Sequence, residues 1–311
     1  MNLKWKKIFG ILTPTRRFER LEAAFLSASS RAAGDALPSS VSDYRKLSLE
    51  LKFAGSQQKK TIEQKLKTLY RDENVKAYIR GNSGNQKRFR DFRLTFREEF
   101  NAGTGNWKPG FYFPDERLKN NYSFHNEKQR NNEGNNTFFR NGAMQIFTRR
   151  EISEGLAWHP QKGFISKTFD YTSDVVHSAD TFHQQGGLFR AKIRCTGNLN
   201  HAFWLGIGKE QPLISIFHWK GSELQVGFMN KNDGDATLIK GINPAEYHIY
   251  SLEWTRNEMI WSINNLEIFR TTFNIPWQPM HLAFNSFIPQ HMQGDEGLME
   301  VDWVRVYQHQ S

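Results

Sequence analysis

The chain has 311 residues, of which 38% are hydrophobic and 14% aromatic, enough to form a sizeable core in one sandwich domain with an appendage. Its single cysteine, Cys195, excludes an intrachain disulfide, so packing has to stabilise the fold. The net charge of +10 is uneven, because residues 1–90 hold 20 Lys and Arg against 8 Asp and Glu, whereas the rest is close to neutral. The basic character therefore belongs to the N-terminal part.

The charged start Met1–Lys7 is followed by a short apolar stretch, Ile8–Leu12. Gly10 interrupts this stretch and Pro14 ends it, so it is shorter than the roughly 7–15 apolar residues of an export signal. No later stretch approaches the roughly 20 apolar residues of a membrane span. We expect a cytoplasmic protein, with a short amphipathic surface anchor as the alternative.

Apolar residues at helical spacing predict an α-helical appendage over residues 1–88. One helix is expected over residues 13–34 and a second over residues 42–55, each with a suitable start and a glycine at its end. A third helix is marked by three apolar residues on one face: Ile62, Leu66 and Leu69.

The lysines of the third predicted helix lie mostly off its apolar stripe: Lys59, Lys60, Lys65 and Lys67. This pattern is typical of a solvated helix face. A protein partner or a membrane surface is the functional alternative for these basic helices. Nucleic acid is the least favoured partner, because no recognised nucleic-acid-binding motif accompanies the charge.

A polar stretch rich in Gly and Asn, Arg80–Arg88, predicts the boundary between the appendage and a second domain at residues 89–311. Beyond it, apolar and polar residues alternate as in half-buried strands. The clearest runs are Phe92, Leu94 and Phe96; Phe189, Ala191, Ile193 and Cys195; His248, Tyr250, Leu252 and Trp254; and Met299, Val301 and Trp303. Strands without intervening helices predict a mainly β protein, an antiparallel β-sandwich or jelly roll.

Two connections can be predicted within the second domain. Asn264-Asn265 is a good two-residue hairpin turn between strands at Met259–Ile263 and Leu266–Phe269, because asparagine tolerates positive φ. Residues 120–141 are asparagine-rich and aperiodic, and are expected to form a long surface loop.

Seven segments, in this order, carry a resemblance to a known family: FRLTFREEFN (92–101), DYTSDVVHSADTF (170–182), GLFRAKIR (187–194), HAFWLG (201–206), YHIYSLEW (247–254), PMHLAFN (279–285) and MEVDWVRVY (299–307). Together they resemble glycoside hydrolase family 16, the laminarinase, lichenase and agarase group. The resemblance implies a concanavalin A-like jelly roll and a polysaccharide or oligosaccharide partner.

Active members of that family carry Glu-x-Asp-x-Glu, or the same motif with one bulge residue, on the strand after the Phe-Trp-Leu segment. A retaining glycosidase needs two carboxylates about 5–5.5 Å apart, which alternate residues of one strand provide. Matched to the bulged form, Leu213, Ser215 and His218 stand at the three positions, and the unbulged form would put Phe217 at the last. No carboxylate remains, so we expect that the family's catalytic residues are missing.

Two further departures are Arg190, in place of a usual glutamate, and Asp174, in place of a glycine. A compensating Asp174–Arg190 ion pair is one hypothesis. A catalytic site rebuilt around His218 is an alternative, with four candidate acids: Asp170, Asp174, Asp180 and Glu210. Ser215 with His218 resembles half of a nucleophile–base pair, but residues three apart on a strand face opposite sides unless a bulge intervenes.

Sugar rings stack their apolar faces on indoles, so Trp204 and Trp219 are predicted to line a glycan groove, with core packing as the alternative. Hydrogen-bonding candidates in the same groove are Ser215, His218 and Asn285. Trp254 and Trp303 lie on strongly alternating strands and are predicted to belong to the core.

The histidines are scattered without a zinc-binding spacing, which argues against a zinc site. Family members often hold a structural calcium through backbone carbonyls and the aspartate that corresponds to Asp302. The resemblance therefore makes Asp302 the candidate calcium ligand, and an ordinary aspartate without a metal is the alternative.

Three functions remain open from the sequence. The first is a pseudoenzyme that binds a β-glycan or acts as a scaffold in polysaccharide metabolism. The second is an active endo-glycosidase that hydrolyses β-glucan or galactan with relocated residues. The third is a structural interaction module.

Overall fold

The structure is a computed structural model, and it describes residues 40, 43–44, 46–48, 51, 56–72, 75–76, 92–101, 105–112, 121–208, 212–230, 233–264 and 266–310. The chain divides into two compact units, one of Met1–Arg93 with Gln310–Ser311 and one of Leu94–His309. The boundary predicted at 88/89 lies outside the described residues.

The N-terminal unit contains the helix α4 (Ser56–Leu69). Leu66 is buried and Ile62 and Leu69 are half-buried, which confirms the third predicted helix, and its four lysines are exposed as expected for a solvated face. Residues 43–44, 46–48 and 51 are helical, in agreement with the second predicted helix, whereas the first lies outside the described residues. Within the described residues, no helix is long and apolar enough to cross a membrane.

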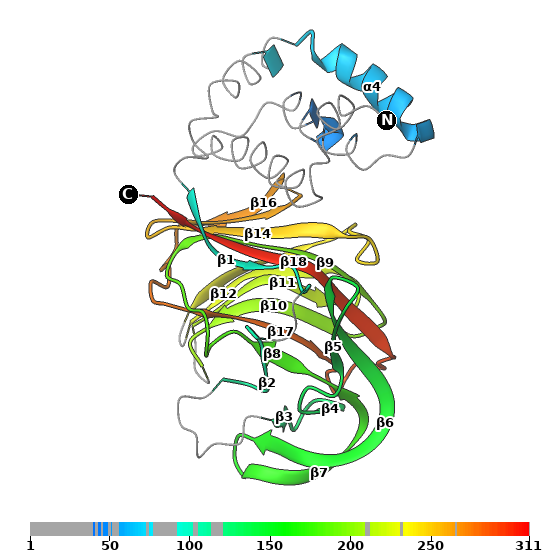
Figure 1. The fold of residues 1–311 in the computed structure, drawn as a ribbon, viewed down its shortest axis with the longest axis vertical. Helices are drawn as coiled ribbons and strands as arrows, with labels where there is room; N and C mark the ends of the chain where they lie inside the picture. Colours follow the sequence, from blue (N-terminus) through cyan, green and yellow to red (C-terminus); the bar gives the residue numbers. More distant parts are fainter. Residues whose placement is uncertain are drawn as a thin grey trace, which may run out of the picture. The chain divides into compact units, whose positions relative to one another are not determined.

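The second unit is a β-sandwich of two sheets, which confirms the predicted jelly-roll class (Figure 1). The larger sheet runs in the order β16-β15-β14-β9-β18-β6-β7-β4, with β1 paired to β18 and with β3 and β5 paired to β6. The smaller sheet runs β13-β12-β11-β10-β17-β8-β2. Apart from β1 with β18, the strand pairs among the described residues are antiparallel, except that β3 with β6 and β4 with β7 are parallel.

The strands of the larger sheet are β1 (Phe92–Glu98), β3 (Ser123–Phe124), β4 (Gln129–Asn131), β5 (Thr137–Arg140), β6 (Ala143–His159), β7 (Gly163–Ser173), β9 (Gly187–Thr196), β14 (His248–Trp254), β15 (Met259–Ile263), β16 (Leu266–Thr271) and β18 (Gly297–His309). Those of the smaller sheet are β2 (Lys108–Pro109), β8 (Val175–His177), β10 (Asn200–Gly206), β11 (Leu213–Lys220), β12 (Leu224–Met229), β13 (Gly234–Ile239) and β17 (His281–Phe287).

The core lies between the two sheets and is formed by the inward residues of the alternating strands. Phe189, Ala191, Ile193 and Cys195 of β9 are all buried in it, as the period-two pattern predicts. Trp254 is fully buried in the same cluster and Trp303 is also buried, as expected for both.

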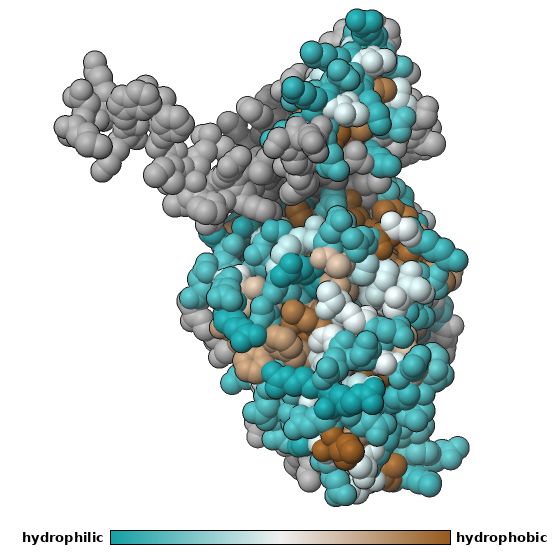
Figure 2. Space-filling model, turned by 90° about the vertical axis from the view of Figure 1, so that its right-hand side faces the viewer, coloured by the Kyte–Doolittle hydropathy of each residue, from teal (hydrophilic) through white to brown (hydrophobic). Residues whose placement is uncertain are grey.

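On the face in Figure 2, hydrophilic side chains cover most of the described surface and apolar side chains form separate patches.

Of the two predicted connections, one is confirmed and one is wrong. Asn264 has φ 49° and joins β15 to β16, as expected for the hairpin turn. Residues 120–141, predicted to be a loop, contain β3, β4 and β5. These strands have two to four residues each, too few to show a period, and buried asparagine amides support them: Nδ2 of Asn131 donates to the carbonyl of Tyr122 (2.6 Å).

The hypothesis of an Asp174–Arg190 ion pair is wrong. The buried Asp174 carboxylate accepts hydrogen bonds from the N–H groups of Asn132 (3.0 Å), Gly134 (3.0 Å) and Asn136 (2.7 Å), all in the segment before β5. Three N–H donors that point at a buried carboxylate satisfy its hydrogen-bonding capacity. The backbone of this turn therefore stabilises Asp174, which was the role that the hypothesis gave to Arg190. Arg190 Nε instead donates to Ser251 Oγ on the neighbouring β14 (3.2 Å).

Candidate functional site

A β-bulge in β11 brings the three positions that the sequence alignment matches to the family's catalytic motif onto one face. In the pairing with β10, Trp204 lies opposite Ser215 and Phe203 opposite Phe217, so Ile216 is the extra residue. Leu213, Ser215 and His218 consequently all line one pocket, which supports the bulged alignment of this strand.

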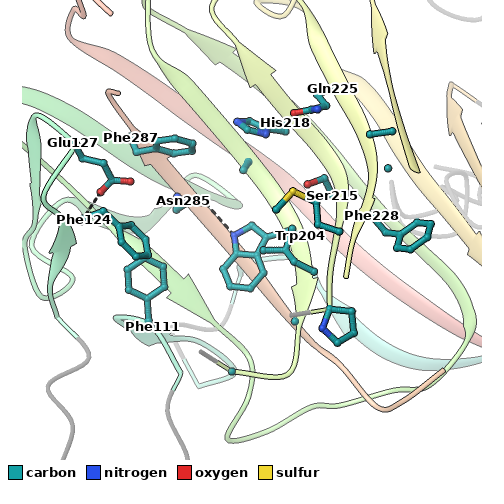
Figure 3. A pocket seen from close by; sticks show the side chains of 18 of the residues that line it. Phe111, Phe124, Glu127, Trp204, Ser215, His218, Gln225, Phe228, Asn285 and Phe287 are labelled. Atoms are coloured by element: carbon teal, nitrogen blue, oxygen red, sulfur yellow. Dashed lines mark hydrogen bonds between the residues drawn. The ribbon is translucent and has the colours of Figure 1, made fainter. Parts of the chain in front are cut away.

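This pocket opens on the smaller sheet and has a volume of about 430 Å³ (Figure 3). Its aromatic lining comprises Phe111, Tyr122, Phe124, Trp204, Phe228 and Phe287. Its side chains with hydrogen-bonding groups, apart from Tyr122 and Trp204, are Glu127, Ser215, His218, Gln225 and Asn285. A concave, mostly apolar surface with a few polar groups is the usual form of a small-ligand site.

Two features hold Trp204 in this pocket: a hydrogen bond to Asn285 and the space that Gly206 leaves free because it has no side chain. Its Nε1 donates to Oδ1 of Asn285 on the neighbouring β17 (3.0 Å). A Cβ at Gly206 would lie 2.6 Å from Cζ3 of Trp204, so the glycine leaves the space that the indole occupies. Trp204 as a whole is 9% exposed, so only a small part of the residue is open to a ligand.

His218 is a neutral imidazole in this pocket at pH 7. Burial, with a contribution from the charge of Lys220, lowers its pKa to about 4. Its Nε2 lies 3.3 Å from Nδ2 of Asn200. A neutral imidazole offers one donor and one acceptor, so it suits hydroxyl groups better than charged groups.

Glu127 is the one carboxyl group among the described residues of the pocket, and sequence reasoning missed it. Its Oε2 accepts hydrogen bonds from the N–H of Phe124 (3.0 Å) and from Nε2 of Gln129 (2.9 Å). Burial outweighs these bonds and raises its pKa to about 7, so near neutral pH the carboxyl group can donate or accept a proton. No local pattern around residue 127 signals this, since the strands next to it are very short.

The structure corrects the prediction for Trp219. Its side chain is buried in the core cluster between the sheets and does not line the pocket. The reason is strand alternation: His218 faces the pocket, so the next residue faces the opposite side. Trp204, Ser215, His218 and Asn285 are brought together in the pocket, and their binding roles stay predictions.

The acids proposed for a relocated catalytic site are not brought together. Asp170 and Asp180 are exposed, Asp174 is bound by the turn before β5, and none of the three lines the pocket. Glu210 lies outside the described residues. Although the bulge puts Ser215 and His218 on one face, neither forms a hydrogen bond to the other within the part of the chain that the structure describes.

The surroundings of Asp302 do not fit a calcium ion. Its Oδ2 accepts a hydrogen bond from Nζ of Lys192 (2.5 Å), so an ammonium group occupies the place next to the carboxylate that a cation would need. Across the described ranges, no group of three or more His, Cys, Asp or Glu could hold a metal ion.

Comparisons with known proteins agree with this architecture. The model of the family described as "Glycosyl hydrolases family 16" matches residues 204–305. A curated relative, the endo-1,3-1,4-beta-glycanase ExsH of Rhizobium meliloti (strain 1021), is 26% identical over 157 residues, which are 45% of this chain. The match covers 34% of that relative, so the chain spans about a third of its length.

Two solved structures show the shared fold. The catalytic domain of an endo-1,3-beta-glucanase (laminarinase) from Thermotoga petrophila RKU-1 is 18% identical with a TM-score of 0.55, over 71% of this chain and 99% of that domain. SCLam, a non-specific endo-beta-1,3(4)-glucanase from family GH16, is 22% identical with a TM-score of 0.56, over 71% of this chain and 92% of its own. Together these matches show that the second unit has the jelly-roll fold of these glucanases and that residues 204–305 are similar to glycosyl hydrolase family 16.

Proposed function

We propose that the jelly roll binds a β-linked glycan in the pocket of the smaller sheet and does not cleave it by paired-carboxylate chemistry. One observation carries the proposal: Leu213, Ser215 and His218 occupy the aligned catalytic positions and face the pocket together. Glycosidases with a carboxylate pair need both groups flanking the bond, whereas the described lining offers Glu127 alone.

The pocket retains groups that recognise a sugar. The open part of the Trp204 indole offers an apolar surface on which a pyranose ring can stack. Ser215, the neutral His218 and Asn285 are placed to exchange hydrogen bonds with hydroxyl groups. No Lys or Arg lines the described part of the pocket, so its chemistry favours a neutral glycan.

The names of the relatives indicate a β-glucan as the ligand class. The curated relative is named as acting on 1,3-1,4-β-linked glycan, and the two structural neighbours as acting on β-1,3- or β-1,3(4)-glucan. We therefore propose β-1,3- or mixed-linkage β-glucan first and galactan second.

Calorimetric binding to oligosaccharides of these glycans tests the proposal. The wild-type chain should bind one class, and Trp204→Ala should weaken that binding at least about tenfold. Phe273→Ala is the matched control, because Phe273 is 50% exposed and does not line the pocket. Failure of the wild type to bind any of these glycans would contradict the proposal and favour a structural interaction module.

Hydrolysis is the second candidate, and Glu127 is the observation that favours it. A carboxyl group with a pKa of about 7 can act as a general acid near neutral pH. A reducing-sugar assay with several hours of incubation distinguishes the two. Release of reducing ends by the wild type that disappears in Glu127→Gln would replace the binding proposal with an endo-glycosidase.

A further inference from the structure

Three aromatic side chains lie in a row across three neighbouring strands. Phe124 of β3 pairs with Trp158 of β6, and Trp158 pairs with Phe164 of β7. Residues directly opposite each other in paired strands point to the same face of the sheet. With strands about 4.8 Å apart, the outer two members are separated by about 10 Å in this direction. We call Phe124, Trp158 and Phe164 the aromatic row.

Ring contacts connect the aromatic row to the pocket. The rings of Trp158 and Phe164 are 5.1 Å apart between centroids, and those of Tyr122 and Phe164 are 5.3 Å apart. Phe124 contacts both Phe111 (5.6 Å) and Tyr122 (5.7 Å). Phe111, Tyr122 and Phe124 also line the pocket, so a series of ring contacts connects the pocket lining to Phe164 and Trp158 on the β6–β7 ribbon.

The aromatic row is partly open to solvent. Phe124 and Phe164 are each 37% exposed, and Trp158 is half-buried. Large apolar side chains that remain exposed next to a ligand pocket indicate a contact surface, because burial elsewhere would be more favourable.

Polar bonds hold the Phe124 end of the row in place. The N–H of Phe124 donates to the buried Glu127 carboxyl group, and Nζ of Lys167 donates to the carbonyls of His125 (2.9 Å) and Glu127 (2.5 Å). The turn after β3 is thereby fixed from two sides. A fixed backbone reduces the conformational entropy that Phe124 loses when a ligand stacks on its ring.

We propose that the aromatic row extends the pocket and stacks successive sugar rings of a long, linear, neutral glycan. This inference rests on the proposed glycan binding and adds that the ligand is a chain longer than the pocket itself. The occupant follows from two observations: the row continues the aromatic lining of the pocket, and its partly exposed aromatic side chains can stack on the apolar faces of pyranose rings.

The test is a length series measured by calorimetry on the full chain, from disaccharide to octasaccharide of the glycan that binds best. In the wild type, affinity should rise about tenfold between trisaccharide and octasaccharide. Phe164→Ala and Trp158→Ala should lose most of this rise and keep the affinity for short oligosaccharides. Trp158→Phe should retain most of it, and Phe273→Ala should behave as the wild type.

Three outcomes would overturn the inference. A flat length series with retained binding of short oligosaccharides would reject the aromatic row and leave the proposed function intact. If affinity rose with oligosaccharide length equally in the wild type and in Phe164→Ala, the aromatic row would also be rejected and the proposed function would remain intact. Absence of any glycan binding would reject both, and self-association in sedimentation that Phe164→Ala abolishes would then assign the row to a second copy of the chain.

Discussion

Replacing Glu127 by glutamine should make the jelly roll's stability less dependent on pH. The buried carboxyl group has a pKa raised from 4.5 to about 7 by desolvation. A glutamine oxygen can continue to accept the hydrogen bonds from Phe124 N–H and Gln129 Nε2, which both reach Oε2. The substitution therefore removes the charge and keeps the turn.

The sign follows from proton binding. A carboxyl group whose pKa is higher in the folded than in the unfolded state binds more protons when folded between pH 4.5 and about 7. The free energy of unfolding of the wild type consequently falls as the pH rises through this window. Over the whole window, the pKa difference between the folded and unfolded states lowers the unfolding free energy by about 3 kcal/mol. Of this loss, about 2 to 3 kcal/mol develops between pH 5 and pH 8.

Urea unfolding of both proteins at pH 5, 6, 7 and 8 measures this difference. Eight of the nine tryptophans lie within residues 94–309, so their fluorescence reports on the jelly roll. Glu127→Gln should gain about 2 to 3 kcal/mol over the wild type from pH 5 to pH 8. The control Glu133→Gln alters a more exposed glutamate nearby and should show a nearly constant difference. If the unfolding free energy of Glu127→Gln relative to the wild type stayed constant or decreased from pH 5 to pH 8, burial would not raise the pKa of Glu127 and the prediction would be wrong.

Three further predictions concern the pocket and the turn before β5. The triple variant Leu213→Glu, Ser215→Asp, His218→Glu should release reducing ends from the bound glycan, because all three positions face the pocket; a folded but inactive variant would count against the alignment. Asp174→Ala leaves the buried N–H of Asn136 and the half-buried N–H groups of Asn132 and Gly134 without their acceptor and should lower the unfolding free energy by about 2 to 3 kcal/mol in urea, while a loss below about 1 kcal/mol would show that water replaces the carboxylate. Gly206→Val should displace the Trp204 indole, because the new Cβ would lie 2.6 Å from its Cζ3, and should weaken glycan binding at least about tenfold by calorimetry; unchanged affinity would show that the indole does not contact the sugar.

The parts of the site that could be predicted lie on segments that resemble the family. Trp204 lies on β10 in the segment HAFWLG, and Asn285 lies on β17 in the segment PMHLAFN. Strand alternation could also have excluded Trp219, since it follows the pocket-facing His218 directly. Glu127 could not be found in this way, because the strands on either side of it have only two and three residues.

The sequence by itself determined the sandwich class, the order of its family-like segments and the absence of carboxylates at Leu213, Ser215 and His218, because alternation and residue identity are local properties. Only the tertiary structure decided that a bulge turns these three positions into one pocket and that Glu127 joins them from a distant part of the chain. The aromatic row likewise depends on strand pairing, because the pairing of β3 with β6 brings Phe124 beside Trp158 from an earlier part of the chain, while Trp158 and Phe164 meet in the β6–β7 hairpin. Strand register depends on the packing of both sheets, and a local pattern does not contain that information.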